Sequence, residues 1–143
     1  MNSRKRYKKS ELINFTYNIL KKVGLNNSNS KIISDLIIRA DERGVWSHGI
    51  VRLPVYVNRI EKKAAKKNPN FKFKKISNNI FHLSGDNGLG YLAANAGIKK
   101  CVSLAKEKGI GLVAISKSNH FGMAANYLEF ASKNKCIAWV YTN

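Results

Sequence analysis

The first half of the chain carries apolar residues at the three- to four-residue spacing of amphipathic helices. A first helix is predicted over residues 10–23, with Ser10 as its N-cap because a serine side chain satisfies free backbone N–H groups there. Gly24 suits the end of this helix. The positions expected to face inward are Leu12, Phe15, Ile19 and Val23.

Two further helices are predicted on the same grounds. The second covers residues 30–43 and ends at Gly44, and the third covers residues 48–67 with Pro54 near its start. A proline is tolerated there because the first turn of a helix has free N–H groups in any case. The expected inward positions are Ile33, Leu36, Ile37 and Ala40 in the second helix, and Leu53, Val57 and Ile60 in the third.

The pattern changes after residues 68–70, where Phe71 and Phe73 alternate with lysines at the period of a strand. A second short strand is expected around residues 80–83. A helix over residues 91–108 and another over residues 124–133 follow, with Ala94, Ile98, Cys101, Val102 and Ala105 inward in the first. The nearly continuous apolar run at residues 111–116 predicts a strand buried on both faces, and residues 136–142 predict a last strand. The sequence thus divides into a helical segment, residues 1–67, and a strand-and-helix unit, residues 71–143.

Residues 85–90 are rich in glycine and precede a predicted helix. A loop that cradles phosphate has this appearance, but the spacing is that of neither the dinucleotide fingerprint nor the P-loop. A plain turn from a hairpin into a helix is therefore favoured.

Composition narrows the classes of protein. With 143 residues, of which 44% are hydrophobic, the chain has the length and apolar content of one folded domain. The apolar runs are too short to cross a bilayer, and the N-terminus lacks the apolar core of an export signal. Cys101 and Cys136 have no metal-binding or redox spacing. Buried thiols in a cytoplasmic protein are expected, without a metal site.

The chain has a formal net charge of +18, from 26 basic and 8 acidic residues. This charge attracts polyanions, so a small basic nucleic-acid-binding or scaffold protein without catalysis is one alternative. Lysine greatly outnumbers arginine, however, and the aromatic residues have core-like spacing rather than that of a nucleic-acid interface. A compositional bias is the favoured explanation, and small anionic molecules would also be attracted.

Candidate chemistry centres on residues 47–52. If Ser47 caps the third helix, His48 lies in its first turn, and Arg52, four residues on, shares its face. A proton donor beside a cation would suit an anionic substrate, whereas the alternative is a surface turn with a solvated histidine. His120 follows a predicted buried strand, where α/β proteins bind ligands, and functional and structural roles are equally favoured for it. His82, inside a short strand, is interpreted as structural.

The same residues carry a family resemblance. Three segments, in order along the chain, resemble the signature of the malate/L-lactate dehydrogenase family, whose members lack a Rossmann fold. The first is Ala40-Asp41-x-Arg43-Gly44-x-x-Ser47-His48-Gly49-x-x-Arg52-Leu53-Pro54-x-Tyr56. The second is Ala105-Lys106-x-x-Gly109-Ile110-Gly111 followed by Ser118-Asn119-His120-Phe121-Gly122, and the third is Thr142-Asn143.

The resemblance implies an oxidoreductase that transfers a hydride between NAD or NADP and C2 of a small 2-oxo, 2-hydroxy or 2-imino acid. It implies an α/β (α+β) fold with a mostly antiparallel sheet wrapped in helices, assembled as a homodimer. The implied catalytic residues are Ser47, His48 and His120. Arg52 and Tyr56 would bind the substrate, and His120, Phe121, Gly122, Met123, Ala124 and Asn143 would line the cofactor site.

The chain also departs from the family pattern. Members are much longer, so this chain is expected to correspond to their N-terminal part, with residues 71–143 as the first part of the cofactor-binding unit. The acidic relay partner of the histidine would then belong to the remainder. The chain is accordingly interpreted as a fragment, a decayed gene product, or one half of a split enzyme that needs a complementary C-terminal polypeptide. Trp46 occupies a position where a small or acidic residue is usual.

Overall fold

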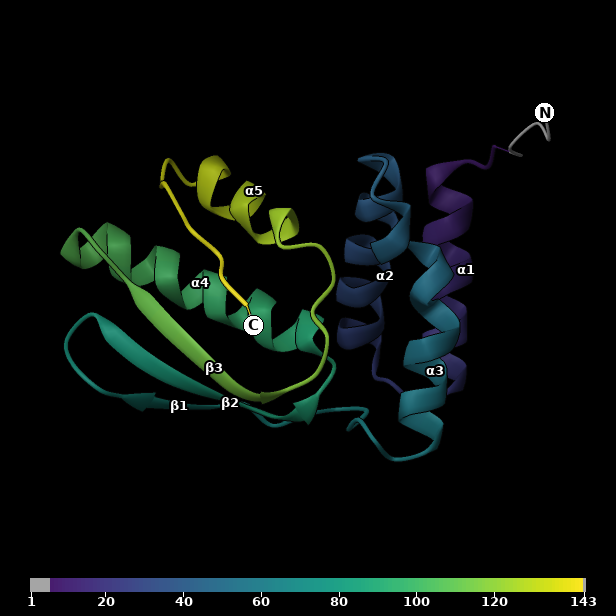
Figure 1. Ribbon diagram of the computed structural model, residues 1–143, viewed down its shortest axis with the longest axis horizontal. Coiled ribbons are helices and arrows are strands. Elements are labelled where there is room, and N and C mark those ends of the chain that lie inside the picture. The colour runs from purple at the N-terminus through teal and green to yellow at the C-terminus, as the bar shows by residue number, and fades with distance from the viewer. Residues whose placement is uncertain (1–5, 143) are drawn as a thin grey trace.

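A computed structural model describes residues 6–142 of the chain. Three helices lie together at one end of the molecule, and a sheet with two further helices forms the other end (Figure 1). The helices are α1 (Lys9–Lys22), α2 (Asn27–Glu42), α3 (Leu53–Glu61), α4 (Gly90–Lys108) and α5 (Ala125–Lys133). The strands are β1 (Lys72–Lys75), β2 (Ile80–Gly88) and β3 (Leu112–Ser118). The mixed α/β class expected from the sequence is confirmed.

Helix α2 packs as the apolar pattern predicts, and α1 does so only in part. All four inward positions expected in α2 are buried. Helix α2 begins three residues earlier than expected because the side chain of Asn26 accepts the backbone N–H of Asn29 (2.8 Å) and caps it. The expected cap at Ser10 is wrong, since α1 begins at Lys9. Phe15 was also placed wrongly: it is 55% exposed, and Thr16 is buried in its stead.

The predicted third helix is too long at both ends. Residues 46–52 form two short 3₁₀ turns, Trp46–His48 and Ile50–Arg52, and α3 follows with Pro54 in its first turn, as expected. The helix cannot extend backward because Gly49 between the turns is extended, with ψ −151°. It stops at Glu61, and Lys63 then adopts a left-handed backbone with φ 56°. Leu53 and Ile60 are buried, as predicted.

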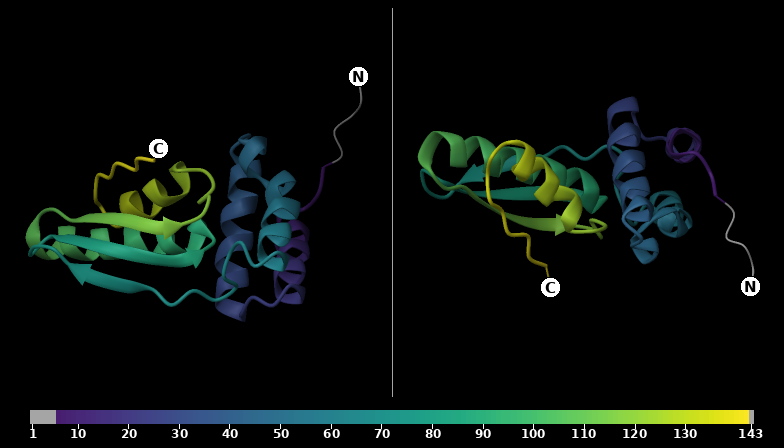
Figure 2. Two further views of the ribbon diagram at one scale, coloured as in Figure 1. Left: turned by 60° about the horizontal axis from the view of Figure 1, so that its bottom comes forward. Right: turned by 90° about the horizontal axis from the view of Figure 1, so that it is seen from above.

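The sheet has the order β1-β2-β3, with β1 antiparallel to β2 and β2 parallel to β3. Strand β2 is longer than predicted and continues to Gly88, so the glycine-rich stretch is mostly strand and α4 starts directly after it. Helix α4 runs along one face of the sheet (Figure 2). A Cβ at Gly97 would touch Ile115 and Val113, which places these side chains of β3 beneath α4.

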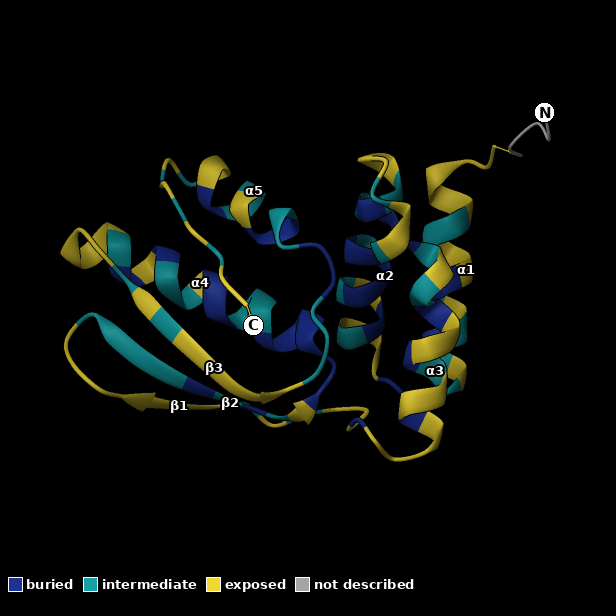
Figure 3. Cartoon of the chain, in the orientation of Figure 1, coloured by how far each residue is buried: buried dark blue, intermediate teal, exposed yellow. Residues whose placement is uncertain are grey.

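Burial at the sheet differs from the prediction. Strand β3 was expected to be buried on both faces, yet within the described residues it is mostly exposed, with Leu112 51% accessible (Figure 3). The physical reason is that α4 covers only one face of the sheet and β3 is its edge. In α4, Ile98 and Val102 are buried as predicted, whereas Ala94, Cys101 and Ala105 are only half-buried.

The predicted last strand is also wrong, because residues 136–142 pair with no strand among the described residues. The period-two pattern is nevertheless real. Cys136, Ala138 and Val140 pack against the core, while Ile137, Trp139 and Tyr141 point outward and are at least 73% exposed. Alternation thus identified the two sides of the segment, but it could not supply a hydrogen-bonding partner.

One hydrophobic core joins both ends of the molecule. It contains Leu20 and Ile37 from the first helices, Ile60 from α3, and Tyr91 and Tyr127 from α4 and α5. The division into residues 1–67 and 71–143 remains a prediction. No helix within residues 6–142 is long and apolar enough to traverse a bilayer.

The core predicts a clear contrast between two positions of the helical end. Ile37→Ala removes a side chain that is 0% exposed and should lower the free energy of unfolding by about 2–5 kcal/mol. Phe15→Ala, at a position 55% exposed, should cost about 1 kcal/mol or less. Urea unfolding followed by circular dichroism measures both. Equal losses would contradict the packing described here.

Candidate active site

The turn after α2 is held by one carboxylate. Asp41 accepts the backbone N–H of Ile50 (2.7 Å), and any side chain at position 49 would collide with that carboxylate, so Gly49 is required. Burial raises the pKa of Asp41, although its hydrogen bond with Ile50 acts in the opposite direction. The turn is therefore fastened to α2, which fixes the direction in which Ser47 and His48 point.

Within the turn, Ser47 does not cap a helix as expected. It lies inside the first 3₁₀ turn, and its hydroxyl is 2.9 Å from Nδ1 of His48. Arg52 lies in the second turn rather than on a helix face shared with His48, and its Nε donates to the backbone carbonyl of Ser47 (2.8 Å). The three residues are still brought together, by a backbone contact and not by helical periodicity.

The ring of His48 stacks on that of His120, a residue far away in the sequence. Their rings are stacked with centroids 5.4 Å apart and an interplanar angle of 28°. His48 comes from the turn after α2, and His120 from the loop between β3 and α5. The sequence singled out both histidines separately, and the fold places them side by side.

The ring of His120 is fixed by two contacts at Nδ1. This nitrogen accepts the backbone N–H of Gly122 (3.3 Å) and lies 2.9 Å from the hydroxyl of Tyr56. Because a backbone N–H can only donate, Nδ1 is an acceptor and the proton of the neutral ring belongs on Nε2. His120 therefore presents an Nε2–H donor on its free side.

Sequence reasoning missed Tyr91, the residue behind Tyr56. Its hydroxyl is 3.0 Å from the Tyr56 hydroxyl, and the rings meet edge to face at 5.4 Å. Burial raises the pKa of both phenols, so each stays protonated. The only sequence signal was a tyrosine in the first turn of the helix after Gly90, and nothing in the pattern identified its partner.

Burial and neighbouring cations keep His120 neutral. Burial is the largest cause that lowers the pKa of His120, followed by His48, Arg52 and Arg59. These groups come from the turn after α2 and from α3, while Tyr56 and Tyr91 supply only neutral hydroxyls. An anion bound beside this ring would offset the neighbouring cations and so reduce the lowering of the pKa of His120.

The loop that carries His120 continues into α5. Phe121 stacks on Tyr127 with centroids 5.6 Å apart, and the Tyr127 hydroxyl donates to the Phe121 carbonyl. Gly122 has φ 77°, and the ring of Tyr91 occupies the space beside it, so no other residue fits well. Met123 is buried and Ala124 half-buried, while Asn143 lies outside the described residues.

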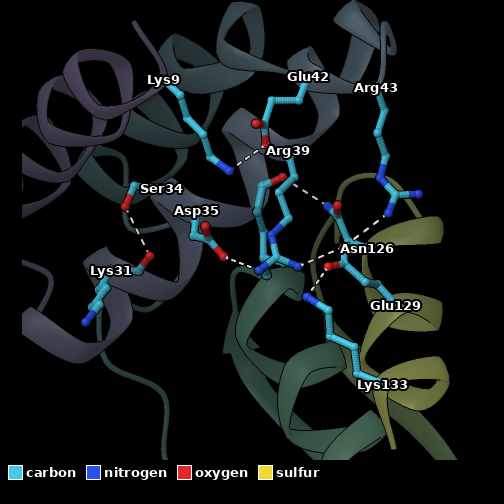
Figure 4. Close-up of polar contacts among 11 residues, drawn as sticks. Lys9, Lys31, Ser34, Asp35, Arg39, Glu42, Arg43, Asn126, Glu129 and Lys133 are labelled. Carbon is cyan, nitrogen blue, oxygen red and sulfur yellow. Dashed lines mark hydrogen bonds and ion pairs between the residues drawn. The ribbon is translucent and has the colours of Figure 1, made fainter. Parts of the chain in front are cut away.

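Helix α5 is in turn fastened to α2 by polar contacts (Figure 4). Glu129 accepts hydrogen bonds from Arg39 of α2 and from Arg43, which follows α2, at 3.1 Å each, and it also binds Lys133 (2.5 Å). Its pKa is lowered, chiefly by the hydrogen bond from Lys133. The buried side chain of Asn126 donates to the Leu36 carbonyl (2.9 Å). The end of the His120 loop that continues into α5 is thereby held against α2.

The histidine pair lines neither of two cavities found among the described residues. One, of about 600 Å³, is an open groove between α1 and α2, and the other, of about 120 Å³, lies between α2, α4 and α5. His82 is remote as well and pairs with Ser116 across the sheet (2.8 Å). No group of three potential metal ligands occurs in residues 6–142. The stacked pair therefore belongs to neither of these cavities.

Comparisons with known proteins agree on one family. The sequence model described as malate/L-lactate dehydrogenase matches residues 7–143. The malate/(S)-sulfolactate dehydrogenase of Methanothermus fervidus is 38% identical over 125 residues, covering 87% of this chain and 37% of that protein. The malate dehydrogenase of Pyrococcus abyssi is 35% identical over 138 residues, covering 96% of this chain and 38% of that protein.

A solved structure gives the same result. The malate dehydrogenase from Pyrococcus horikoshii OT3 superimposes with a TM-score of 0.88 at 33% identity, covering 90% of this chain and 37% of that one. Two more distant relatives carry their cofactor in their names, NAD(+) for the ureidoglycolate dehydrogenase of Escherichia coli and NADP(+) for a sulfolactate dehydrogenase of Chromohalobacter salexigens. The chain spans somewhat more than a third of the length of the relatives it matches.

The site predicts how His120 titrates. Its pKa should lie below the ordinary value of 6.5, and Arg52→Gln should raise it because a neighbouring cation is removed. Arg43→Gln is the control, since Arg43 binds Glu129 instead. Imidazole NMR signals followed against pH report all three proteins.

The same shift links to stability. Because the folded-state pKa of His120 is lowered, the unfolded chain binds this proton first, so the contribution of neutral His120 is lost as the pH falls below about 6.5. A His120 titration at or above the ordinary value would contradict the burial of this ring.

Proposed function

The chain belongs to the malate/L-lactate dehydrogenase family, and from this premise we propose that it forms the N-terminal part of an NAD(P)-dependent oxidoreductase of small 2-oxo acids. The reaction would interconvert such an acid, or a 2-imino acid, with its 2-hydroxy or 2-amino counterpart. The observation that carries the proposal is the stacking of His48 on His120, 5.4 Å apart, with the charge of Arg52 acting on the same ring. A proton donor beside a cation is what the reduction of an anionic carbonyl compound requires.

Arg52 is proposed to bind the carboxylate of the substrate. In the described part of the chain its hydrogen bond uses Nε, so both terminal amino groups are left for a ligand. A guanidinium matches a carboxylate in charge and in the spacing of its donors. The names of the relatives, malate and sulfolactate dehydrogenases, refer to substrates of this anionic class.

The proton is proposed to pass through the histidine pair. His120 offers its Nε2–H, and its ring is held by Tyr56 and Gly122 from behind. His48 is oriented by the hydroxyl of Ser47 (2.9 Å), which would belong to its proton relay. Tyr56 is only 1% exposed, so this structure supports a role through His120, while direct binding of substrate by Tyr56 stays a prediction.

The residues of the site fit an anionic dinucleotide in charge, because Arg52 and Arg59 both act on His120. When bound, NAD(P) would supply or accept the hydride at C2 of the substrate. His120, Phe121 and Ala124 are half-buried and would line the cofactor side, whereas Gly122 and Met123 pack inward and would shape the loop. The preference between NAD and NADP stays open. We propose a cytoplasmic homodimer, completed by the remaining part of the family domain.

Cofactor binding can be tested on the chain itself. NADH should quench the fluorescence of Trp46, which is 53% exposed next to Ser47, and should raise the melting temperature, because a ligand that binds only the folded state stabilises it. Trp46→Phe should remove most of the quenching and leave the thermal shift. Tight, salt-sensitive binding of DNA with no effect of NADH would instead favour a charge-driven polyanion binder.

Catalytic roles can be tested in a chimera. The described residues would replace the aligned part of the Pyrococcus horikoshii malate dehydrogenase, 37% of that chain. His48→Ala should lower kcat about 10²–10⁴-fold, the usual contribution of general acid–base catalysis. Arg52→Ala should raise KM for the acid about 10–100-fold, as for the loss of a charged hydrogen bond. Lys22→Ala, which removes an exposed cation of α1, should behave as the parent, and unchanged kinetics in the first two variants would sink the site assignment.

A further inference from the structure

We propose that Asn119 is a positioning residue for His120: its side-chain amide fastens the loop that carries the histidine to the end of β2 and to α3. This inference rests on the proposed function, since it gains its meaning from the role of His120 in that site. The support is geometric, and it comes from contacts made by one half-buried side chain.

The amide of Asn119 reaches two other elements. Its Nδ2 lies within hydrogen-bonding distance of three oxygens, the carbonyl and side-chain oxygens of Asn87 (3.2 and 3.1 Å) and the Gly88 carbonyl (3.2 Å). Its Oδ1 accepts Nη1 of Arg59 (2.7 Å). Arginine can only donate and the two carbonyls can only accept, so the orientation of the amide is fixed and a carboxylate could not replace it.

The backbone on both sides of this amide is also held. The Asn119 N–H donates to the Gly88 carbonyl (3.2 Å), and the Gly90 N–H donates to the His120 carbonyl (3.1 Å). A Cβ at Gly90 would collide with the carbonyls of Asn119 and His120, so the start of α4 and the His120 loop are in direct backbone contact. The loop cannot move away from the start of α4 without breaking all of these contacts together.

The anchor is itself supported from a third side. Asn87 has a left-handed backbone with φ 54°, and its side chain donates to the Ala64 carbonyl (3.2 Å). Its own carbonyl accepts the Lys66 N–H (2.9 Å). Asn119 therefore contacts α3 directly through Arg59, and it contacts the segment that follows α3 indirectly through Asn87. In this way it fixes the distance between α3 and the loop of His120.

The distance between α3 and this loop matters because it sets the contacts of the His120 ring. This ring bonds to Tyr56 of α3 and faces His48, Arg52 and Arg59, with Tyr91 behind Tyr56. A loop released from β2 would carry the imidazole toward solvent and away from these groups. Since burial is the main cause of the lowered pKa of His120, release should move the pKa back toward its ordinary value.

The test compares Asn119→Ala with Asn134→Ala in the full chain. Asn134 is a matched control, because its amide likewise donates to a carbonyl, that of Phe130 (2.8 Å), and accepts from a cation, Lys106 (2.7 Å), but it lies beyond α5. Hydrogen exchange should be about two- to tenfold faster in Asn119→Ala than in the control at two backbone N–H groups, those of residue 90 and residue 119. This factor corresponds to the loss of one net hydrogen bond. The NMR titration of His120 should move up only in Asn119→Ala.

Equal exchange rates in the two variants, an unmoved His120 titration, or acceleration spread over all helices would each overturn the proposal. If Asn119→Ala does not fold, Arg59→Lys decides, because it keeps the charge and replaces only the donor to Oδ1 at an exposed position. Faster exchange confined to the same two amides supports the proposal, and none overturns it. Neither readout uses turnover, so failure of the dehydrogenase assignment would be seen separately, in the NADH and kinetic experiments.

Discussion

The hydrogen bond between Tyr56 and His120 is the contact on which the site depends. Tyr56 belongs to the helical end of the molecule, and His120 belongs to the loop that leaves the sheet. Tyr91, at the start of α4, closes the third side of the same junction. All the hydroxyls involved are buried, so each must keep a partner. Any rearrangement of α3 against the sheet would break the junction and separate His48 from His120.

Local periodicity predicted the elements of the helical end well but their boundaries less well. The stripe of α2 is buried as expected, because a 3.6-residue period survives whatever surrounds it. The start of α3 could not be read this way. Gly49 is extended, and the N–H of its neighbour Ile50 is bound by Asp41 from the end of α2, a contact that no local periodicity encodes. The error at β3 has the same origin. An apolar run shows that a strand can be covered on both faces, but its burial depends on which elements actually cover it.

The candidate site was predictable in its members but not in its arrangement. Ser47, His48 and Arg52 stand out in sequence, yet the helix face that was expected to align them does not exist. The position of His120 after a strand favoured a functional and a structural role equally, and only the resemblance to a family implied a catalytic role. Tyr91 was missed, because a pairing with Tyr56 is a long-range contact between α3 and α4 that neither local pattern announces.

The cations around His120 couple ligand binding to protonation. While Arg52 and Arg59 are unpaired with a ligand, they oppose a positive charge on the ring, and burial acts in the same direction. A carboxylate bound at Arg52, as proposed, would cancel part of that field and move the pKa of His120 back toward its ordinary value. By linkage, protonation of the ring would tighten binding of the same anion by an equal factor. Substrate binding would then ease protonation of the ring, whereas in the free protein burial and the neighbouring arginines favour the neutral ring, as does the formal net charge of +18.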